Sequence, residues 1–270
     1  MCGSATSDDD VEKLLDGSQI DTIHTDPPYG VDYKSKKLGG IMNDELKNDS
    51  LYQLVYDAFY IAKEHIKDDA ATYCWYEDKY RHIFQSALED AGYEFKQNLV
   101  WNKGMNLSGA DYQKAHENML YLQLKDCKAK WFGGRDKKTI LGKRRTDIAT
   151  MKKSDLIAAL VAMQSQSTVW DIDRDVVTTY VHPTQKPIHI AARAIQNSTE
   201  DGDVIYDGFA GSGSTLIACE QIGRTNYSME LDPKYTDVIR KRYAKFTNDN
   251  ELPDNWEELT PAIAGGEQVT

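Results

Sequence analysis

Residues 203–215 read Asp-Val-Ile-Tyr-Asp-Gly-Phe-Ala-Gly-Ser-Gly-Ser-Thr, and this stretch decides the fold. Its first five residues have the β-branched and aromatic composition of a strand, and a helix is expected from the glycine loop to about Gln221. Glycines between a strand and a helix let the backbone approach a ligand closely, and the helix N-terminus favours negative charge. The loop lacks the Gly-Lys-Ser/Thr ending of a P-loop. It therefore predicts a ligand-binding turn of another kind.

The strand expected at 224–231 (RTNYSMEL) supports this interpretation, because it places Glu230 at its tip. Nucleotide-binding sheets hold ribose hydroxyls with an acid at the end of the second strand. Strands and helices alternate along most of the chain, which predicts an α/β protein with a mainly parallel sheet flanked by helices. The other expected strands are 20–25, 71–76, 94–101 and 118–124, and the other expected helices are 50–66, 79–91, 154–163, 186–196 and 233–246.

A second motif, Asp26-Pro27-Pro28-Tyr29, directly follows the strand expected at 20–25. Two successive prolines fix the loop and remove backbone donors. A carboxylate, free carbonyls and an aromatic ring remain. Such a loop can accept hydrogen bonds from an exocyclic amine while the ring stacks on a flat heterocycle. Taken alone, the four residues fit a rigid surface turn equally well.

The third motif is His182-Pro-Thr-Gln-Lys-Pro187, which leads into the helix expected at 186–196. Proline is well suited to a helix start, because its missing N–H would have no partner there. By itself this motif favours a helix-entry turn with a hydrogen-bonded histidine.

The net charge of −11 is unevenly spread along the chain. Residues 1–22 carry a net −5 and residues 247–270 a net −6, so residues 23–246 sum to zero. Within that neutral body, residues 125–153 hold eleven Lys or Arg and three Asp, a net +8. This basic stretch fits either a solvated loop or a surface that contacts phosphates.

Composition excludes several classes of protein. With 40% apolar and 28% charged residues, the chain is neither disordered nor a disulfide scaffold. It has no apolar run near the ~18 residues that span a bilayer and no signal-peptide layout, so no membrane association is expected. The cysteines are scattered and form no CxxC pair: Cys2, Cys74, Cys127 and Cys219. They indicate reduced thiols in a cytoplasm, and the six dispersed histidines argue against a metal site.

Together the three motifs resemble those of S-adenosylmethionine-dependent DNA amino-methyltransferases. The similarity is to the permuted group in which the catalytic motif precedes the cofactor motif, and to small phage- or prophage-type methylases. It covers about residues 2–246 and extends to four further segments: 101–103 (WNK), 108–117 (SGADYQKAHE), 168–174 (TVWDIDR) and 229–235 (MELDPKY). The resemblance implies a Rossmann-like methyltransferase fold and S-adenosylmethionine as cofactor.

The resemblance also implies roles for individual residues. Asp26 and the Pro27 carbonyl would accept hydrogen bonds from the amine of a flipped-out base, and Tyr29, held by Pro28, would stack on that base. Glu230 would hold the ribose of the cofactor, Asp207 would face its methionine amine, and Lys186 would lie near its methionine carboxylate. The cofactor contacts implied are Asp207, Phe209, Gly211, Ser212, Gly213, Ser214, Thr215, Glu230, Thr184 and Lys186.

The resemblance divides the chain into a methyltransferase domain, residues 1–246, and a loosely attached acidic tail, residues 247–270. A target-recognition region inserted at about 125–180 coincides with the basic stretch, which shifts that stretch toward DNA contact. The expected DNA contacts are Arg135, Lys143, Arg144 and Arg145. The implied partner is double-stranded DNA, with a homodimer as a further expectation. A restriction-modification role in a bacterial or phage-infected cytoplasm is also implied.

In the family that the chain resembles, members with Asp at the first position of the Asp26–Tyr29 motif mostly act on adenine N6, and Ser there is commoner for cytosine N4. Asp26 therefore implies adenine N6 as the target, with cytosine N4 as the first alternative. Cytosine C5 methylation is excluded because no cysteine follows a proline. Protein glutamine methylation fits poorly, since its motif normally begins with Asn and follows the cofactor loop. An RNA methylase and a degenerate DNA-binding module remain alternatives.

Two positions depart from the pattern that the resemblance sets. Gly208 stands where proline is usual in the cofactor loop, and glycine can adopt the φ of proline. Ser4 stands where an acid commonly contacts the adenine amine of the cofactor. Serine accepts a hydrogen bond but brings no charge, so a weaker grip on the adenine is expected.

Overall fold

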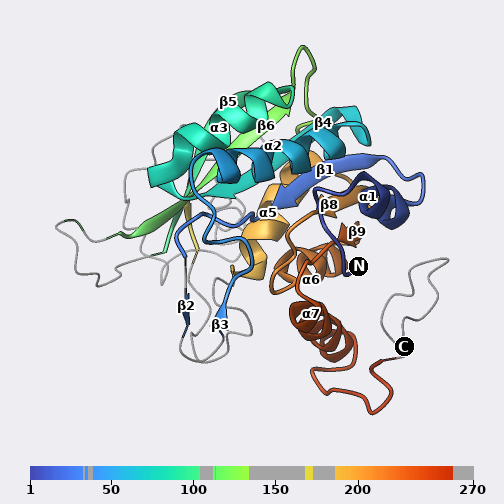
Figure 1. Cartoon of the computed structure of the whole chain (residues 1–270). Helices are drawn as coiled ribbons and strands as arrows, with labels where there is room; N and C mark the ends of the chain where they lie inside the picture. Colours follow the sequence, from blue (N-terminus) through green and yellow to red (C-terminus); the bar gives the residue numbers. More distant parts are fainter. Residues whose placement is uncertain are drawn as a thin grey trace, which may run out of the picture.

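A seven-stranded sheet with β1 (Ile20–Thr25) near its centre organises the chain (Figure 1). The computed structural model describes residues 1–32, 34–35, 39–103, 112, 114–133, 168–172 and 186–257. The strand order is β7-β5-β6-β4-β1-β8-β9. The remaining strands of this sheet are β4 (Ile66–Tyr76), β5 (Tyr93–Asn102), β6 (His116–Leu124), β7 (Val169–Asp171), β8 (Val204–Asp207) and β9 (Thr225–Ser228). A separate small hairpin pairs β2 (Lys34–Ser35) with β3 (Gly39–Gly40).

The sheet is mainly parallel, as the alternation of strands and helices predicts. β1 pairs parallel with both β4 and β8, and β8 pairs parallel with β9. β6 is the exception, because it runs antiparallel to both of its neighbours, β4 and β5. β6 is the next strand along the chain after β5, and consecutive strands that pair directly are commonly antiparallel, since a parallel pair needs a longer crossover connection.

Helices cover both faces of the sheet. On one face lie α1 (Asp8–Leu15), α2 (Asp49–Lys63) and α3 (Arg81–Asp90), preceded by the short η1 (Asp78–Tyr80). They share a buried core that includes Leu15, Leu51 and Phe84. On the other face lie α5 (Ile188–Ser198) and α6 (Ser214–Gln221), which bury Ile195 and Cys219. α7 (Pro233–Phe246) follows β9 and contacts α6.

α1 is a helix that the sequence analysis did not predict. Its first turn consists of Asp8, Asp9 and Asp10, and the Ser7 side chain caps it by accepting from the Asp10 amide. Carboxylates at a helix N-terminus interact favourably with the helix dipole. Much of the negative charge of residues 1–22 is thereby explained as helix structure.

Two boundaries of the expected strands differ from expectation by three residues or more. β4 begins at Ile66, earlier than the expected residue 71, because its polar start is stabilised by an ion pair between Lys67 and Asp21 at 2.7 Å. β9 ends at Ser228 rather than at 231. Glu230 continues the edge as a single bridge with Cys2, so the N-terminal segment lies beside the end of β9.

The expected recognition region, 125–180, is only partly described. Its first part, 125–133, lies at the end of the sheet where β1 starts. Lys130 pairs there with Asp69 at 3.3 Å and with Asp21 at 3.5 Å. Asp26 lies at the other end of the sheet, because it directly follows the last residue of β1. Residues 169–171 form β7 and pair parallel with β5, so they belong to the main sheet. The helix expected at 154–163 lies outside the described residues.

The start of the acidic tail is attached to the body. Lys241 Nζ lies 4.6 Å from the ring centroid of Trp256, and Arg240 donates to the Glu257 carbonyl at 2.9 Å. Residues 247–257 therefore contact α7, whereas 258–270 lie outside the described part. The division into a domain and a loosely attached tail stays a prediction. No helix among the described residues is long and apolar enough to cross a membrane.

Candidate active site

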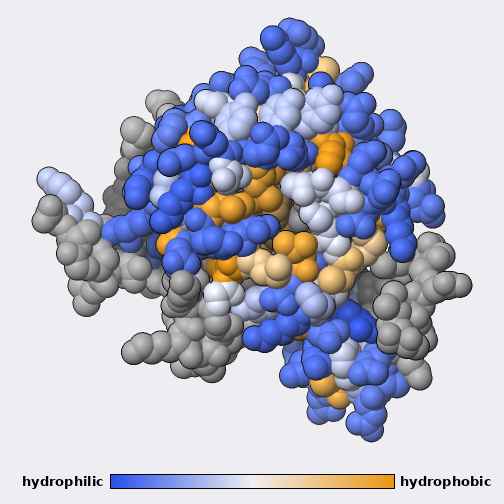
Figure 2. All heavy atoms as spheres, viewed as in Figure 1, coloured by the Kyte–Doolittle hydropathy of each residue, from blue (hydrophilic) through white to orange (hydrophobic). Residues whose placement is uncertain are grey.

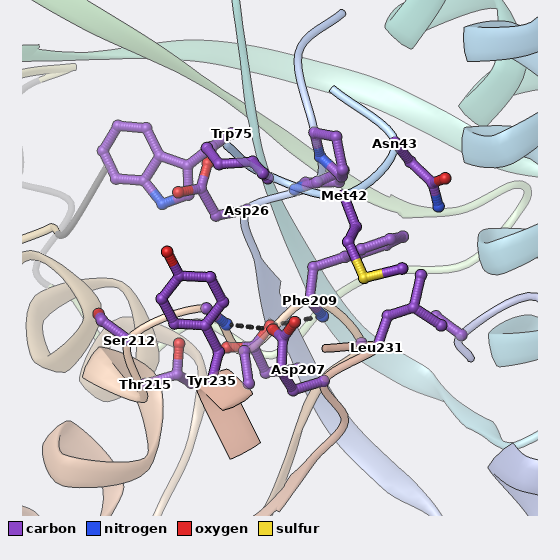
Figure 3. A pocket seen from close by; sticks show the side chains of 18 of the residues that line it. Asp26, Met42, Asn43, Trp75, Asp207, Phe209, Ser212, Thr215, Leu231 and Tyr235 are labelled. Atoms are coloured by element: carbon purple, nitrogen blue, oxygen red, sulfur yellow. Dashed lines mark hydrogen bonds between the residues drawn. The ribbon is translucent and has the colours of Figure 1, made fainter. Parts of the chain in front are cut away.

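A pocket opens at the ends of β1 and β8, where the helices that follow these two neighbouring strands lie on opposite faces of the sheet. Ligands of open α/β sheets bind at such switch points. The pocket has about 1170 Å³ of empty space, part of it open to solvent. Figure 2 shows apolar residues gathered between α2 and α6 on this face of the molecule. Figure 3 shows Asp26, Asp207 and Phe209 around the same pocket.

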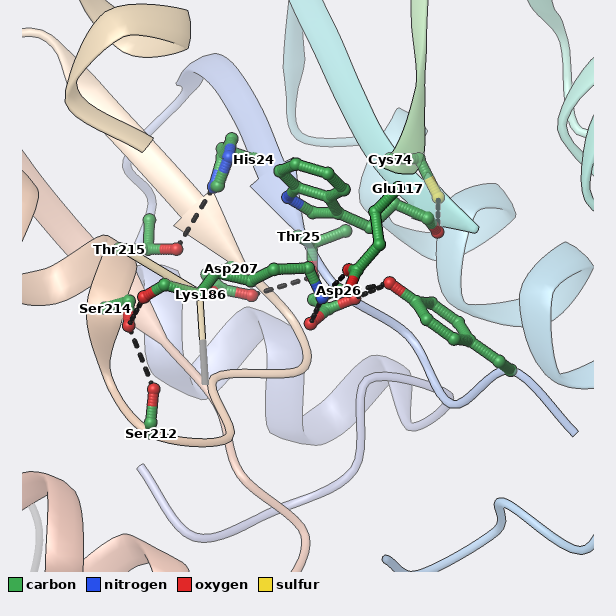
Figure 4. Close-up of polar contacts among 12 residues, drawn as sticks. His24, Thr25, Asp26, Cys74, Glu117, Lys186, Asp207, Ser212, Ser214 and Thr215 are labelled. Atoms are coloured by element: carbon green, nitrogen blue, oxygen red, sulfur yellow. Dashed lines mark hydrogen bonds and ion pairs between the residues drawn. The ribbon is translucent and has the colours of Figure 1, made fainter. Parts of the chain in front are cut away.

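The carboxylate of Asp26 is held from two sides. Its Oδ1 accepts a hydrogen bond from the Tyr29 hydroxyl at 2.6 Å, and its Oδ2 accepts from Lys186 Nζ at 2.6 Å (Figure 4). Burial raises the pKa of Asp26, and the Lys186 ammonium and the Tyr29 hydroxyl oppose this rise. The side chain of Asp26 remains 24% exposed, so a ligand in the pocket can still reach it.

Lys186 is the centre of a buried charge network. Its ammonium also donates to the Tyr29 hydroxyl at 3.0 Å and pairs with Glu117 at 3.3 Å. Despite the opposing effect of burial, Lys186 and Lys103 lower the pKa of Glu117 to about 2. The ammonium lies 4.9 Å from the Trp75 ring centroid. With three acceptors around three N–H groups, this ammonium has no donor left for the cofactor.

Asp44 fixes the turn that presents Tyr29. One of its carboxylate oxygens accepts from the Tyr29 amide at 2.8 Å and from the Gly30 amide at 3.0 Å. Gly30 has a φ of +75°, a conformation in which a side chain would be strained. Asp44 is buried and reaches the turn from a separate loop, so no local pattern indicated its role.

The glycine loop and Glu230 form one hydrogen-bonded unit. The Gly211 amide donates to Glu230 Oε2 at 2.8 Å, and the Asp232 amide donates to Oε1 at 3.0 Å. Burial raises the pKa of Glu230, and these amides oppose the rise. Gly213 precedes α6 with a φ of +74°, and a Cβ there would lie 2.9 Å from Ile239. Close packing of α7 therefore requires glycine at this position.

Asp207 ends β8 at the base of the pocket. It accepts from the Thr25 hydroxyl at 2.7 Å and from the Phe209 amide at 3.2 Å. Burial raises the pKa of Asp207 to about 6, although hydrogen bonds from Thr25, Thr215 and the Phe209 amide act against the rise. A cation placed beside this buried carboxylate would strongly stabilise its ionised form.

The two departures from the expected pattern are both visible at this site. A Cβ on Gly208 would lie 3.0 Å from both the Ala5 side chain and the Tyr206 hydroxyl, so the loop is tightly packed where proline is usual. Ser4 lines the pocket and shares a hydrogen bond with Thr6 at 2.8 Å. Its amide is held by Asp10, which lies outside the pocket lining.

Most residues expected at the site surround this one pocket. Those lining it are Asp26, Pro27, Pro28, Tyr29, Lys186, Asp207, Phe209, Gly211, Ser212, Ser214, Thr215 and Glu230. Gly213 is in the same loop behind the lining. The remaining expected residues, Thr184, Arg135, Lys143, Arg144 and Arg145, lie outside the described residues.

The sequence analysis missed four residues of the site: His24, Asp44, Trp75 and Glu117. Glu117 belongs to the segment 108–117 that carries part of the resemblance, and this was the available signal. Lys186 was expected at the methionine carboxylate of the cofactor, but its ammonium pairs with Asp26 and Glu117. In the part of the chain that the structure describes, no three His, Cys, Asp or Glu residues are grouped to hold a metal ion.

Comparison with known proteins places these observations in a family. The model of the N6/N4 methyltransferase family, described as DNA methylase, matches residues 20–241. The type II methyltransferase M2.DpnII of Streptococcus pneumoniae is 25% identical over 239 residues, which cover 83% of this chain and 82% of that protein.

Solved structures share the fold. The complex of M1.HpyAVI with S-adenosylmethionine matches with a TM-score of 0.60 and 19% identity, covering 90% of this chain and 97% of that one. The PvuII DNA methyltransferase, described as cytosine-N4-specific, matches with a TM-score of 0.63 and 15% identity, covering 98% and 92%. The family match spans most of the chain, including most of the residues that line the pocket. The chain therefore belongs to the N6/N4 DNA methylase family, whose methyl donor is S-adenosylmethionine.

Proposed function

We propose that the chain methylates the exocyclic N6 of adenine in double-stranded DNA, at a specific sequence, on a base flipped out of the helix. The position of Asp26 carries this proposal. Its carboxylate reaches the pocket from the end of β1, next to the glycine loop that follows β8. Each carboxylate oxygen has room for a second hydrogen bond, so an amine can bind without displacing Lys186 or Tyr29.

The pocket residues fit S-adenosylmethionine. Glu230 has one backbone donor on each oxygen and can still accept from the two hydroxyls of a ribose. Phe209 and Leu231 offer apolar surface for a purine (Figure 3). Asp207 is suited to the α-ammonium group, as the resemblance implied. When bound, this cofactor supplies an electrophilic methyl group on its sulfonium.

The residues of the Asp26–Tyr29 motif make the amine reactive. The nitrogen lone pair of an exocyclic amine is delocalised into the ring. Hydrogen bonds from its two N–H groups to Asp26 and to the Pro27 carbonyl favour a pyramidal nitrogen and strengthen toward the transition state. The lone pair then forms the N–C bond to the methyl carbon as the C–S bond breaks and its electron pair stays on sulfur. One amine proton then leaves, and Asp26, which accepts a hydrogen bond from that N–H, can receive it.

Tyr29 contributes to holding the extruded base. Flipping costs a few kcal/mol of unstacking, and aromatic stacking offsets part of that cost. The Tyr29 ring packs edge-on against Phe84 with centroids 6.4 Å apart, which fixes its plane. Recognition of the DNA sequence by Arg135, Lys143, Arg144 and Arg145 stays a prediction, as do the homodimer and the cytoplasmic restriction-modification role.

The target base is tested by expressing the chain in a bacterial host that lacks DNA methylation and sequencing its DNA by a modification-sensitive method. N6-methyladenine at one short motif is the expected result. N4-methylcytosine would instead support the alternative that the likeness to PvuII methyltransferase favours. Methyl uptake by RNA but not DNA would support an RNA methylase. Unmodified DNA, with folded protein and cofactor present, would contradict the proposal and favour a degenerate DNA-binding module.

A further inference from the structure

The loop that presents Tyr29 has no free backbone N–H group. Pro27 and Pro28 carry none, because their nitrogens are closed into rings. The two amides that follow, those of Tyr29 and Gly30, both donate to the same oxygen of Asp44, at 2.8 Å and 3.0 Å. From Pro27 to Gly30, the backbone beside the pocket therefore offers carbonyl oxygens and no free donor.

Asp44 reaches these amides from a turn that is fastened to the same loop. Its own amide donates to the Ile41 carbonyl at 3.3 Å and closes the turn, and its carbonyl accepts from the Asp32 amide at 2.7 Å. Asp44 is 2% exposed and lines the pocket, as do Met42 and Asn43 of the same turn (Figure 3). The Asp44 side chain is therefore a fixed part of the pocket wall.

Gly30 makes the double contact with Asp44 possible. Consecutive N–H groups that converge on one anion are typical of a backbone in which one residue has a positive φ, and the φ of Gly30 is +75°. A Cβ on Gly30 would also clash with the Leu46 carbonyl oxygen. Glycine is therefore the residue type that allows both amides to reach the carboxylate.

The side-chain donors around Asp26 are engaged as well. The Tyr29 hydroxyl donates to Asp26 Oδ1. The Lys186 ammonium is matched by three acceptors, namely the same carboxylate, the Tyr29 oxygen and Glu117 (Figure 4). The Trp75 N–H, on another residue of the lining, is itself buried and presents no donor to a ligand. A ligand at Asp26 therefore meets acceptors: the carboxylate and the carbonyls of the loop.

We propose that Asp44 is a positioning residue that determines specificity: by engaging both amides of the loop, it selects bases with an exocyclic amine over bases with a carbonyl oxygen at the same place. An amine donates two hydrogen bonds to this wall. A carbonyl oxygen would face Asp26 and the Pro27 carbonyl with no donor between them, which is costly. The inference rests on the proposed methylation of a base amine and holds for adenine and cytosine alike.

Loss of the Asp44 side chain should remove this selectivity. In Asp44→Ala the amides of Tyr29 and Gly30 become free donors at the pocket wall, where they can bond to a carbonyl oxygen. The loop also loses the contact that fixes the direction of its own carbonyls. Asp44→Asn keeps a side-chain oxygen that can accept from both amides, so it should behave as wild type does.

Binding of duplex DNA to the whole protein, saturated with S-adenosylhomocysteine, tests this role. Two duplexes carry the sequence that the methylation experiment identifies. One has adenine at the target position, and the other has hypoxanthine, in which a carbonyl oxygen replaces the amine; cytosine and uracil form the equivalent pair. An abasic site opposite the target removes differences in base pairing.

The ratio of the two affinities, measured by fluorescence anisotropy, is the result of interest. Wild type and Asp44→Asn should bind the duplex with the amine at least about tenfold more tightly, the effect of one buried hydrogen bond. For Asp44→Ala the preference should fall below about threefold. General loss of stability does not produce this change, because a partly unfolded variant binds both duplexes less well by the same factor.

Glu45→Ala is the matched control. It removes the neighbouring acid of the same segment, which is exposed and does not line the pocket, and it should keep the wild-type ratio. If Asp44→Ala does not fold, hydrogen exchange of the Tyr29 and Gly30 amides in wild type decides the question. Slow exchange supports the proposal, and fast exchange of both amides contradicts it.

Three further results would overturn the inference. A wild-type ratio in Asp44→Ala would show that Asp26 rejects the carbonyl oxygen without help. A lost preference in Asp44→Asn would show that the charge of Asp44 matters and its hydrogen-bond acceptor does not. Equal affinity of wild type for the two duplexes would show that the wall is not selective. Failure of the proposed function is distinct from these, because wild type would then transfer no methyl group to DNA.

Discussion

Lys186 Nζ lies 2.6 Å from Asp26 Oδ2 and so joins two motifs that are 160 residues apart in the chain. The ammonium binds the carboxylate that we propose accepts the amine of the target base. A buried ion pair that is also hydrogen-bonded is strongly destabilised when one partner is removed. We therefore treat Lys186 as part of the methyl-acceptor side of the pocket, where it orients Asp26.

Asp26→Ala should lower the rate of methyl transfer by at least about 100-fold, because the amine loses its main acceptor. Affinity for S-adenosylhomocysteine should stay within about threefold of wild type, since cofactor contacts come from other residues. Transfer of a radiolabelled methyl group to DNA and calorimetric binding measure the two quantities. Asp57→Ala, on the exposed surface of α2, is the control for loss of a carboxylate. Near-normal turnover by Asp26→Ala would reject its assigned role.

Glu117→Gln should shift the acid limb of the transfer rate to lower pH. The negative charge of Glu117 raises the pKa of Asp26, to which it is linked through the shared Lys186 ammonium. Removing that charge lowers the pKa of Asp26, so the carboxylate stays ionised to a lower pH. Single-turnover rates between about pH 5 and pH 9 measure the shift.

Glu117→Gln also leaves Lys103 without its anion, and Lys103 is only 9% exposed. The variant should therefore unfold at a lower temperature than wild type. The double variant Glu117→Gln/Lys103→Met should recover stability while keeping the shifted pH profile. An acid limb that does not move in either variant would show that Glu117 has no electrostatic influence on Asp26.

Asp207→Asn should stabilise the fold above pH 6 while weakening cofactor binding. The pKa of Asp207 is about 6 in the folded protein, above its ordinary 3.8, so the folded state resists ionisation there. The carboxylate therefore destabilises the fold by about 3 kcal/mol at pH 8, and this penalty disappears as pH falls from 6 toward 4. The neutral amide avoids it.

Thermal unfolding of wild type and Asp207→Asn at pH 8 and at pH 4.5 measures this difference. The variant should have the higher Tm at pH 8 and little advantage at pH 4.5. Calorimetry should show weaker binding of S-adenosylhomocysteine by the variant at pH 8, because the ammonium has lost its anion. Higher stability without any loss of affinity would remove Asp207 from the cofactor site.

Local patterns in the sequence predicted the parts of the fold that local chemistry determines. The strand, glycine loop and helix of 203–221 appear as expected. Both the strand and the turn with glycines at positive φ depend on residues that are adjacent in the sequence, so a short segment is enough to predict them. α1 was not predicted because its three successive acids were counted only as negative charge and not as the first turn of a helix. The reversed direction of β6 was also missed, because only pairing with distant strands sets it.

The site shows the same division. The Asp26–Tyr29 motif and the glycine loop were identified from residue types in short segments. Glu117 and Asp44 act through contacts with residues far away in the chain, and no spacing encodes those contacts. The ion pairs of Lys186 with Asp26 and Glu117 were not predicted for the same reason, and its contact with the cofactor stays a prediction.

The acidic segment after α7 should weaken DNA binding by electrostatic repulsion, and its removal should strengthen it. Deleting 247–270 would also uncover Arg240 and Lys241, because both lie over the Trp256 ring. A cleaner variant keeps Trp256 and replaces the acids around it by their amides. The acids to be replaced are Asp249, Glu251, Asp254 and Glu257.

This variant should bind duplex DNA more tightly than wild type at low salt, and the advantage should shrink as salt increases, because screening weakens repulsion between exposed charges. Fluorescence anisotropy at two salt concentrations gives the comparison, and Trp256→Ala shows the separate effect of releasing the segment from α7. An affinity equal to wild type at both salt concentrations would mean that the segment lies far from bound DNA. In that case the net charge of −11 has no bearing on DNA binding.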